Sequence, residues 1–87
     1  MTRSVFSPAY AALRDSLVAA RRSRGLTQTE LAEILHRPQS FVSKYERGER
    51  RLDLVEVMEI AAALGVDSHE FVTKVNQVLA TGSPGES

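Results

Sequence analysis

Residues 26–51 constrain the fold more than any other stretch of this sequence. The stretch opens with a helix start, in which Thr27 can cap the free amides and Glu30, three residues later, can bond back to it. Apolar residues then recur at helical spacing, at Leu31, Ile34 and Leu35. The pattern predicts a short helix with an apolar inner side, and the small residue Ala32 lets a second helix cross it closely.

A second short helix is predicted to begin at Pro38 and to stop at Gly48. Proline suits the first helical position, because the amide that it lacks would be unpaired there, and glycine readily adopts the left-handed conformation that ends a helix. Val42 and Tyr45, three residues apart, are expected to face inward. The outward face is expected to carry polar groups, one cation and one exposed aromatic ring: Gln39, Ser40, Phe41, Ser43 and Lys44.

Two short helices joined by a tight turn form a helix-turn-helix, and in DNA-binding versions the second helix lies in the major groove. The alternative is a helical hairpin whose polar face is merely solvated, and the pattern alone leaves both open. The stretch contains the run Leu26-Thr27-Gln28…Glu30-Leu31-Ala32…Ser40…Val42-Ser43-Lys44…Glu46-Arg47-Gly48-Glu49-Arg50. This run resembles the phage repressor-like helix-turn-helix family (XRE, Cro/CI-type), and the resemblance extends loosely from Leu13 to Phe71.

This resemblance implies an all-α, five-helix lambda repressor-like DNA-binding domain. The chain departs from the family at His36, where glycine is usual, and at Arg37, where a small aliphatic residue is usual. His36 is therefore expected to take the left-handed conformation, which few residues other than glycine adopt. Arg37 has no side-chain acceptor with which to cap the helix that follows.

The composition fits a single small domain of 87 residues. The absence of cysteine excludes disulfides and thiolate metal sites, and no apolar run approaches the roughly 20 residues of a membrane span. We therefore expect a cytoplasmic protein without a membrane partner. A chain this short buries limited surface alone, and oligomerisation is a common remedy.

The charges divide unevenly along the chain although the formal net charge is zero. Residues 1–51 hold ten basic and five acidic side chains, a balance of +5, whereas residues 52–87 hold one and six, a balance of −5. The helix-turn-helix stretch belongs to the basic half. An anionic partner such as double-stranded DNA would be attracted to one end and repelled by the other.

The chain is expected to divide into a flexible arm at residues 1–6, a helical domain at residues 7–80 and a disordered tail at residues 81–87. The first helix should run from Pro8 to Arg24, with Ser7 as its cap. The resemblance implies an internal ion pair between Arg21 near its end and Glu46 on the second helix of the motif.

Two further helices are predicted after the motif, with capping boxes at Asp53–Glu56 and Asp67–Glu70. The inner face of the fourth helix is expected to comprise Leu54, Val57, Met58, Ala61 and Leu64, and two acidic residues, Glu56 and Glu59, are expected to face solvent. The apolar stripe of the fifth helix is wide, and part of it is expected to meet another copy of the chain. The predicted dimer interface consists of Phe71, Val72, Val75, Val78 and Leu79, with the end of the fourth helix.

In the predicted DNA complex, bases would be read by the outward face of residues 39–44, and phosphates would be bound by Thr27, Gln28 and Arg47, with Arg37, Arg50 and Arg51 as weaker candidates. The role of Gln28 rests on the resemblance. The sequence thus predicts a sequence-specific transcriptional regulator, a repressor that binds an inverted repeat as a homodimer. The alternative is an antitoxin-type module that binds a toxin protein as well as its own promoter.

An enzyme is disfavoured, because His36 and His69 stand alone without the spacing of metal ligands and no glycine-rich phosphate loop is present. No cofactor or metal is expected. A regulator that answers a small ligand is also disfavoured, because 87 residues leave no room for a sensor domain.

Overall fold

The computed structural model describes residues 7–81, and this part of the chain is built from helices and turns. Its elements are α1 (Pro8–Ser23), α2 (Gln28–Leu35), α3 (Gln39–Glu46), α4 (Leu54–Leu64) and α5 (His69–Thr81). The prediction of an all-α fold with five helices is confirmed. The predicted arm at residues 1–6 lies outside the described residues, as does the predicted tail except Thr81, which is the last residue of α5.

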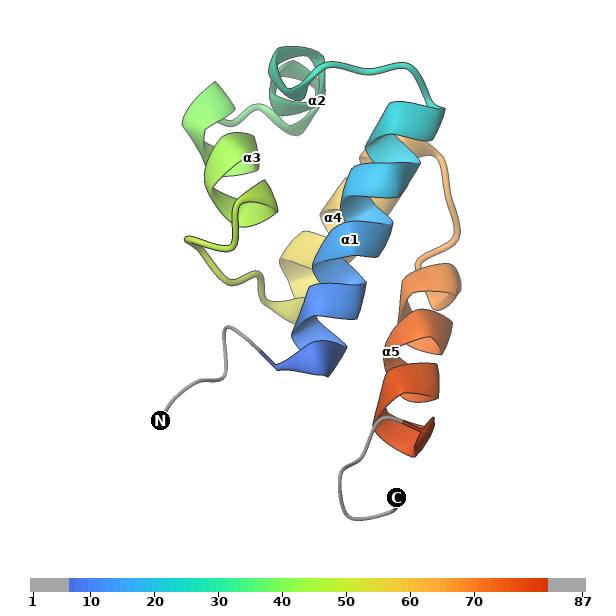
Figure 1. Cartoon of the computed structure of the whole chain (residues 1–87). Helices are drawn as coiled ribbons and strands as arrows, with labels where there is room; N and C mark the ends of the chain where they lie inside the picture. Colours follow the sequence, from blue (N-terminus) through green and yellow to red (C-terminus); the bar gives the residue numbers. More distant parts are fainter. Residues whose placement is uncertain (1–6, 82–87) are drawn as a thin grey trace.

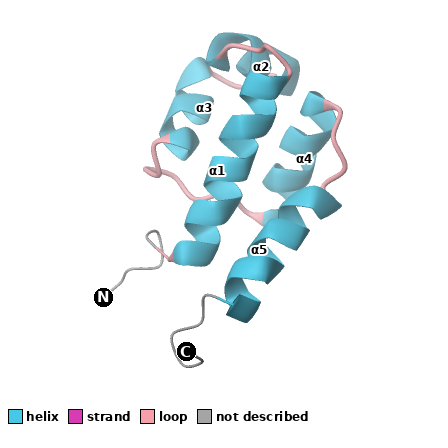
Figure 2. Cartoon of the chain, turned by 45° about the vertical axis from the view of Figure 1, so that its right-hand side comes forward, coloured by secondary structure: helices cyan, strands magenta, loops and turns pink. Residues whose placement is uncertain are grey.

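Helix α1 is the axis of the molecule, because α3, α4 and α5 all pack against it. Helix α2 packs on α3 and α4 but crosses above the end of α1 (Figure 1). Turning the molecule shows that α3 and α5 lie on opposite sides of α1 (Figure 2). The helix-turn-helix and the terminal helix therefore present separate faces. Within residues 7–81, every helix falls short of the length and apolar character needed to cross a membrane.

The helix starts follow from local hydrogen bonds, and most of these starts agree with those predicted from the sequence. The Ser7 hydroxyl accepts from the Tyr10 amide, and capping boxes form at Thr27 and Asp53. Helix α3 differs by one position, since Pro38 is its N-cap and the helix has no side-chain cap. The predicted box at Asp67 is also wrong: its carboxylate accepts from the backbone of His69, and Glu70 donates to the Asp67 carbonyl instead.

The core lies where α1, the helix-turn-helix and α4 meet. Its fully buried side chains come from every element except α5, which contributes Phe71 at 3% exposure; they are Leu17, Leu31, Val42, Tyr45, Ile60 and Leu64. The predicted inner face of α4 needs correction at two positions, because Leu54 and Met58 are 68% and 50% exposed. The buried stripe instead follows the spacing i, i+3, i+4, i+7 through Val57, Ile60, Ala61 and Leu64.

Candidate nucleic-acid interface

The turn between α2 and α3 holds the two helices in a fixed relation. His36 ends α2 with φ 58° and ψ 41°, so the predicted left-handed conformation is confirmed. Its backbone N–H donates to the Glu33 carbonyl, and the N–H of Arg37 donates to the Ala32 carbonyl, so two carbonyls in the last turn of α2 are satisfied. Ala32 is 2% exposed, which fits the close crossing that its small side chain allows.

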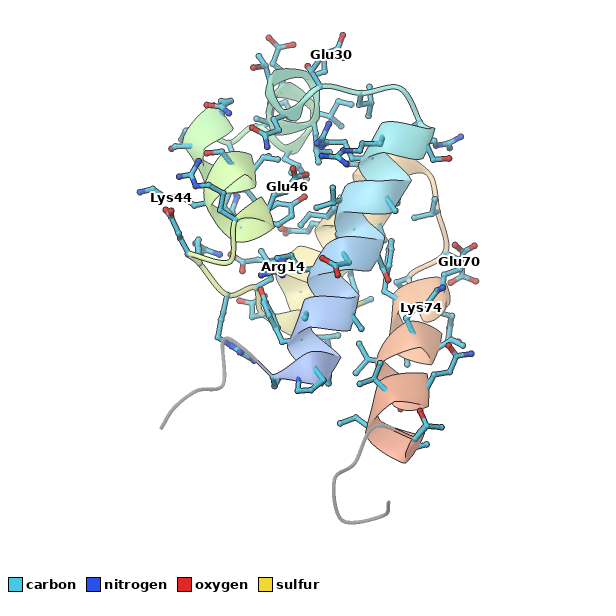
Figure 3. The ribbon with its side chains drawn as sticks, in the orientation of Figure 1. Arg14, Glu30, Lys44, Glu46, Glu70 and Lys74 are labelled. Atoms are coloured by element: carbon cyan, nitrogen blue, oxygen red, sulfur yellow. The ribbon has the colours of Figure 1, made fainter. Side chains whose placement is uncertain are left out.

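The outer side of α3 is polar, as predicted, except for its aromatic ring. Gln39, Ser40 and Lys44 are exposed, and Ser43 is half-buried with its hydroxyl bonded to the Ser40 carbonyl. Lys44 projects away from the body of the molecule, whereas Glu46 points back toward α1 (Figure 3). The outer side thus offers amide, hydroxyl and ammonium groups to whatever approaches α3.

The prediction that Phe41 faces outward is wrong. Its side chain is 8% exposed, and its ring meets that of Tyr45 edge-on with 5.5 Å between centroids. Two guanidiniums also lie over the Phe41 ring, that of Arg37 at 4.3 Å and that of Arg50 at 4.9 Å from the centroid. Phe41 shares the inner side of α3 with Val42 and Tyr45, and the arginines cover the part of its ring that the helices leave exposed.

A buried network fixes α3 against α1 and α2. Glu46 accepts two hydrogen bonds from Arg21, at 2.7 and 3.0 Å, and one of 2.9 Å from the side-chain amide of Gln28. Arg21 also donates to the Leu26 carbonyl at 2.6 Å. The two charged side chains are only 9% and 6% exposed. The pair that the sequence resemblance implied is therefore present, and the hydrogen bond to Glu46 raises the pKa of Arg21.

The same network reaches the surface through Gln28. The side-chain amide of Gln39 donates to the Gln28 oxygen at 2.9 Å, while Gln28 donates to Glu46. A glutamine amide carries two N–H donors and an acceptor oxygen, so each of these hydrogen bonds uses only one of the polar groups of its glutamine. Gln39 at the start of α3 is thus oriented, through one intermediate side chain, by a buried carboxylate.

The residues predicted to bind phosphate fall into two groups. Thr27 and Gln28 lie at the start of α2, and Arg47 lies in the exposed loop after α3. There Arg47 pairs with Glu49 at 3.0 Å, and this hydrogen bond lowers the pKa of Glu49. Arg37 and Arg50 point toward an acidic residue of α4, so their guanidiniums are paired within the chain, and their contact with phosphate stays a prediction.

That acidic residue is Glu56, which the sequence interpretation placed in solvent. It is 9% exposed and accepts a forked pair of bonds from Arg50 at 3.0 and 2.9 Å, with Arg37 3.6 Å away. The bonds from Arg50 lower the pKa of Glu56 to about 2. The signal that could have revealed it is its place in a capping box beside a run of arginines that need acceptors.

One part of the α5 surface is apolar, but one of the residues predicted for it does not belong to it. Phe71 is buried in the core, so its assignment to a dimer interface is wrong. Val72 and Leu79 are 45% and 58% exposed, and Val75 and Val78 are half-buried. A groove of about 280 Å³ runs between α5, the start of α1 and the start of α4. The exposed apolar residues of α4 nearest this groove lie at the start of α4, whereas the predicted interface includes the end of that helix.

Comparisons with known proteins bear on this geometry. The helix-turn-helix family model (HTH_3) matches residues 17–71. A relative from Sinorhizobium fredii (strain NBRC 101917 / NGR234), described as the uncharacterized HTH-type transcriptional regulator y4dJ, is 39% identical over 57 residues, or 66% of this chain and 74% of that protein.

Two solved structures are similar at the level of sequence as well as fold. An XRE-family like protein from Pseudomonas syringae pv. tomato str. DC3000 is 47% identical with a TM-score of 0.76, covering 80% of this chain and 85% of that chain. The restriction-modification controller protein C.AhdI from Aeromonas hydrophila is 31% identical with a TM-score of 0.65, covering 70% and 92%.

Proposed function

Because this chain belongs to the XRE-type helix-turn-helix family of DNA-binding transcriptional regulators, we propose that it is a repressor that binds an inverted-repeat operator as a homodimer. The observation that carries the proposal is the outer side of α3, which is polar and exposed while its inner side is locked by the Glu46 network. A rigid, polar helix face is what direct reading of base edges requires. The family is non-enzymatic, and the described residues hold no cluster of potential metal ligands.

Base reading is assigned to Gln39, Ser40, Ser43 and Lys44. Gln39 uses one amide N–H on Gln28, and its amide has a second N–H and an oxygen, which is the combination that adenine requires. Lys44 can donate to guanine acceptors, and the two serines can reach a base or a phosphate. Phe41 has no part in this set, because its ring is buried.

Phosphate binding is assigned to Thr27, Gln28 and Arg47, at the two ends of the helix-turn-helix. Gln28 and the start of α2 offer N–H groups to a phosphate, and Arg47 offers a guanidinium on an exposed loop. Arg47 would exchange its exposed partner Glu49 for a phosphate at little cost, since surface ion pairs contribute little. These contacts supply affinity that does not depend on sequence.

Dimerisation is assigned to Val72, Val75, Val78 and Leu79 of α5. Helix α5 lies on the opposite side of α1 from α3, so a two-fold axis beside α5 would leave both copies of α3 at the outer ends (Figure 2). Two copies of α3 could then enter successive major grooves about 34 Å apart. Exposed apolar side chains on one face usually mark an interface.

Selection of binding sites from random duplexes, followed by fluorescence anisotropy at several salt concentrations, tests the proposal. We expect an inverted repeat with half-sites about one helical turn apart and an affinity that falls as salt rises. Recovery of an asymmetric site would overturn the homodimer. Absence of any salt-sensitive binding to duplex DNA would overturn the proposed function as a whole.

A further inference from the structure

Glu56 lies outside the helix-turn-helix, yet it gathers side chains from three segments around that motif. Arg37 comes from the turn before α3, Phe41 from α3 itself, and Arg50 from the loop after it. Both guanidiniums approach the Glu56 carboxylate and both lie over the Phe41 ring. Glu56 also accepts the backbone N–H of Asp53 at 3.0 Å, which fixes its carboxylate at the start of α4.

This cluster is a polar link between α3 and α4. The close backbone packing of α3 is with α2 and α1, and besides the shared core its connection to α4 includes Phe41 and the guanidiniums around Glu56. The ring of Phe41 is held between α3 and these guanidiniums, and its edge contact with Tyr45 continues into the core. Loss of the Glu56 charge would therefore loosen the side of α3 that Glu46 does not hold.

The cluster also pairs two cations of the basic half of the chain with an acidic residue. The Arg37 and Arg50 side chains are 34% and 40% exposed, so they lie close enough to the surface to reach a phosphate if they were released. The forked bonds to Glu56 aim Arg50 at α4 instead. Each additional phosphate contact would strengthen binding to every duplex, whereas a loosened α3 would weaken the base contacts that only the operator receives. Together the two changes would lower the ratio between specific and non-specific affinity.

We propose that Glu56 is a specificity-determining positioning residue: it holds Phe41 and α3 in place and keeps Arg37 and Arg50 from binding phosphate indiscriminately. The inference rests on the proposed function, because it concerns how selectively the same surface binds DNA. It assigns a role in discrimination to a residue that touches no base.

The test compares Glu56→Gln with the wild-type chain on the selected operator and on a random duplex across a salt series. Glutamine keeps the size of the side chain and an acceptor for the Asp53 amide, but it removes the charge that holds the arginines. We expect tighter binding to random DNA, a plot of log K against log salt that is steeper by about 1 to 2, and an operator preference at least about 10-fold lower.

The matched control is Glu59→Gln, which removes the same charge from the next turn of α4. Glu59 is half exposed and lies 3.8 Å from Arg37, so this variant also takes an acidic neighbour from one arginine. We expect its salt slope and preference to match the wild type. Addition of Arg50→Gln to the Glu56→Gln chain should bring the salt slope back toward the wild-type value.

A salt slope of Glu56→Gln equal to that of Glu59→Gln would overturn the inference, and so would equal losses of affinity for both duplexes, which a purely structural role predicts. If Glu56→Gln fails to fold by circular dichroism, the variants Arg37→Gln and Arg50→Gln decide. Unchanged salt slopes would support the inference, and a slope shallower by about 1 for each would overturn it. Failure of the wild type to bind any duplex would instead overturn the proposed function.

Discussion

The two helices on either side of α1 are held in opposite ways. Helix α3 is short, and its inner side carries buried rings together with a carboxylate that accepts three hydrogen bonds. Helix α5 is longer, and Phe71 is its one buried residue in the described structure. Directional polar contacts fix the orientation of α3, whereas apolar contacts bring α5 close to α1 without specifying one rotation as strictly. Base reading needs the first kind of support, and association of two copies can use the second.

The largest effect is expected at the polar support of α3. Glu46→Ala leaves Arg21 buried without its carboxylate, and breaking such a pair costs about 3–5 kcal/mol of unfolding free energy. Urea denaturation measures this loss. Glu49→Ala removes the partner of Arg47 at a fully exposed pair, and its unfolding curve should match the wild type. Similar losses for both variants would show that burial does not distinguish these pairs.

The apolar side of the comparison is tested by charges on α5. Val75→Asp with Leu79→Asp should split the proposed dimer and lower operator affinity by more than about 100-fold, because a monomer retains one half-site. Sedimentation velocity and anisotropy measure the two effects. Thr73→Asp with Gln77→Asp adds the same charges at exposed polar positions of α5 and should preserve both dimer and affinity. Dimers that persist in the first variant would contradict this interface.

A smaller effect separates the residues that α3 and α2 present to DNA. Gln39→Ala should cost roughly 1–3 kcal/mol at its own base pair and relax the preference there. Gln28→Ala should weaken all duplexes, because it removes the proposed phosphate contact, with a smaller additional loss at the Gln39 base pair because the link from Gln39 to Glu46 is lost. Binding to a panel of single-base operator variants distinguishes the two. Uniform losses for both substitutions would show that the division between reading and anchoring is wrong.

The smallest effect concerns the turn that sets α3 against α2. His36→Gly should stabilise the fold by about 0.5–1 kcal/mol, because glycine adopts the left-handed conformation of His36 without the steric cost of a Cβ atom. Thermal unfolding measures the gain. His36→Ala keeps the Cβ atom and should bring none. A gain from alanine equal to that from glycine would mean that the imidazole, and not the backbone, is the source.

Features that depend on a few neighbouring residues could be predicted from the sequence. The caps at Thr27 and Asp53 and the left-handed His36 are of this kind, because each involves atoms within four positions along the chain. The helix order follows from them. The resemblance added the Arg21–Glu46 pair, which joins positions 25 residues apart and has no local signal.

The orientation of single side chains on short helices could not be predicted in the same way. The sequence pattern predicts Phe41 outward and Glu56 in solvent, and both predictions fail for one reason: Arg37 and Arg50, from other segments, cover the ring and satisfy the carboxylate. In the sequence alone, a charged residue is expected to face solvent, because the residues that pair with it in the fold are not known. The apolar stripe of α5 likewise does not indicate that Phe71, unlike the other residues of the stripe, is buried in the core.

The separation of roles along α3 has a consequence for how such a protein can change. Ser40 and Lys44 are exposed, and the Ser43 hydroxyl bonds within its own helix, whereas the anchoring contacts use Val42, Tyr45 and Glu46. If positions 40, 43 and 44 read bases as proposed, substitution there would alter the DNA sequence that is recognised while the scaffold stays intact. Duplicated copies of the gene could diverge toward new operators through these three codons, without any compensating change elsewhere.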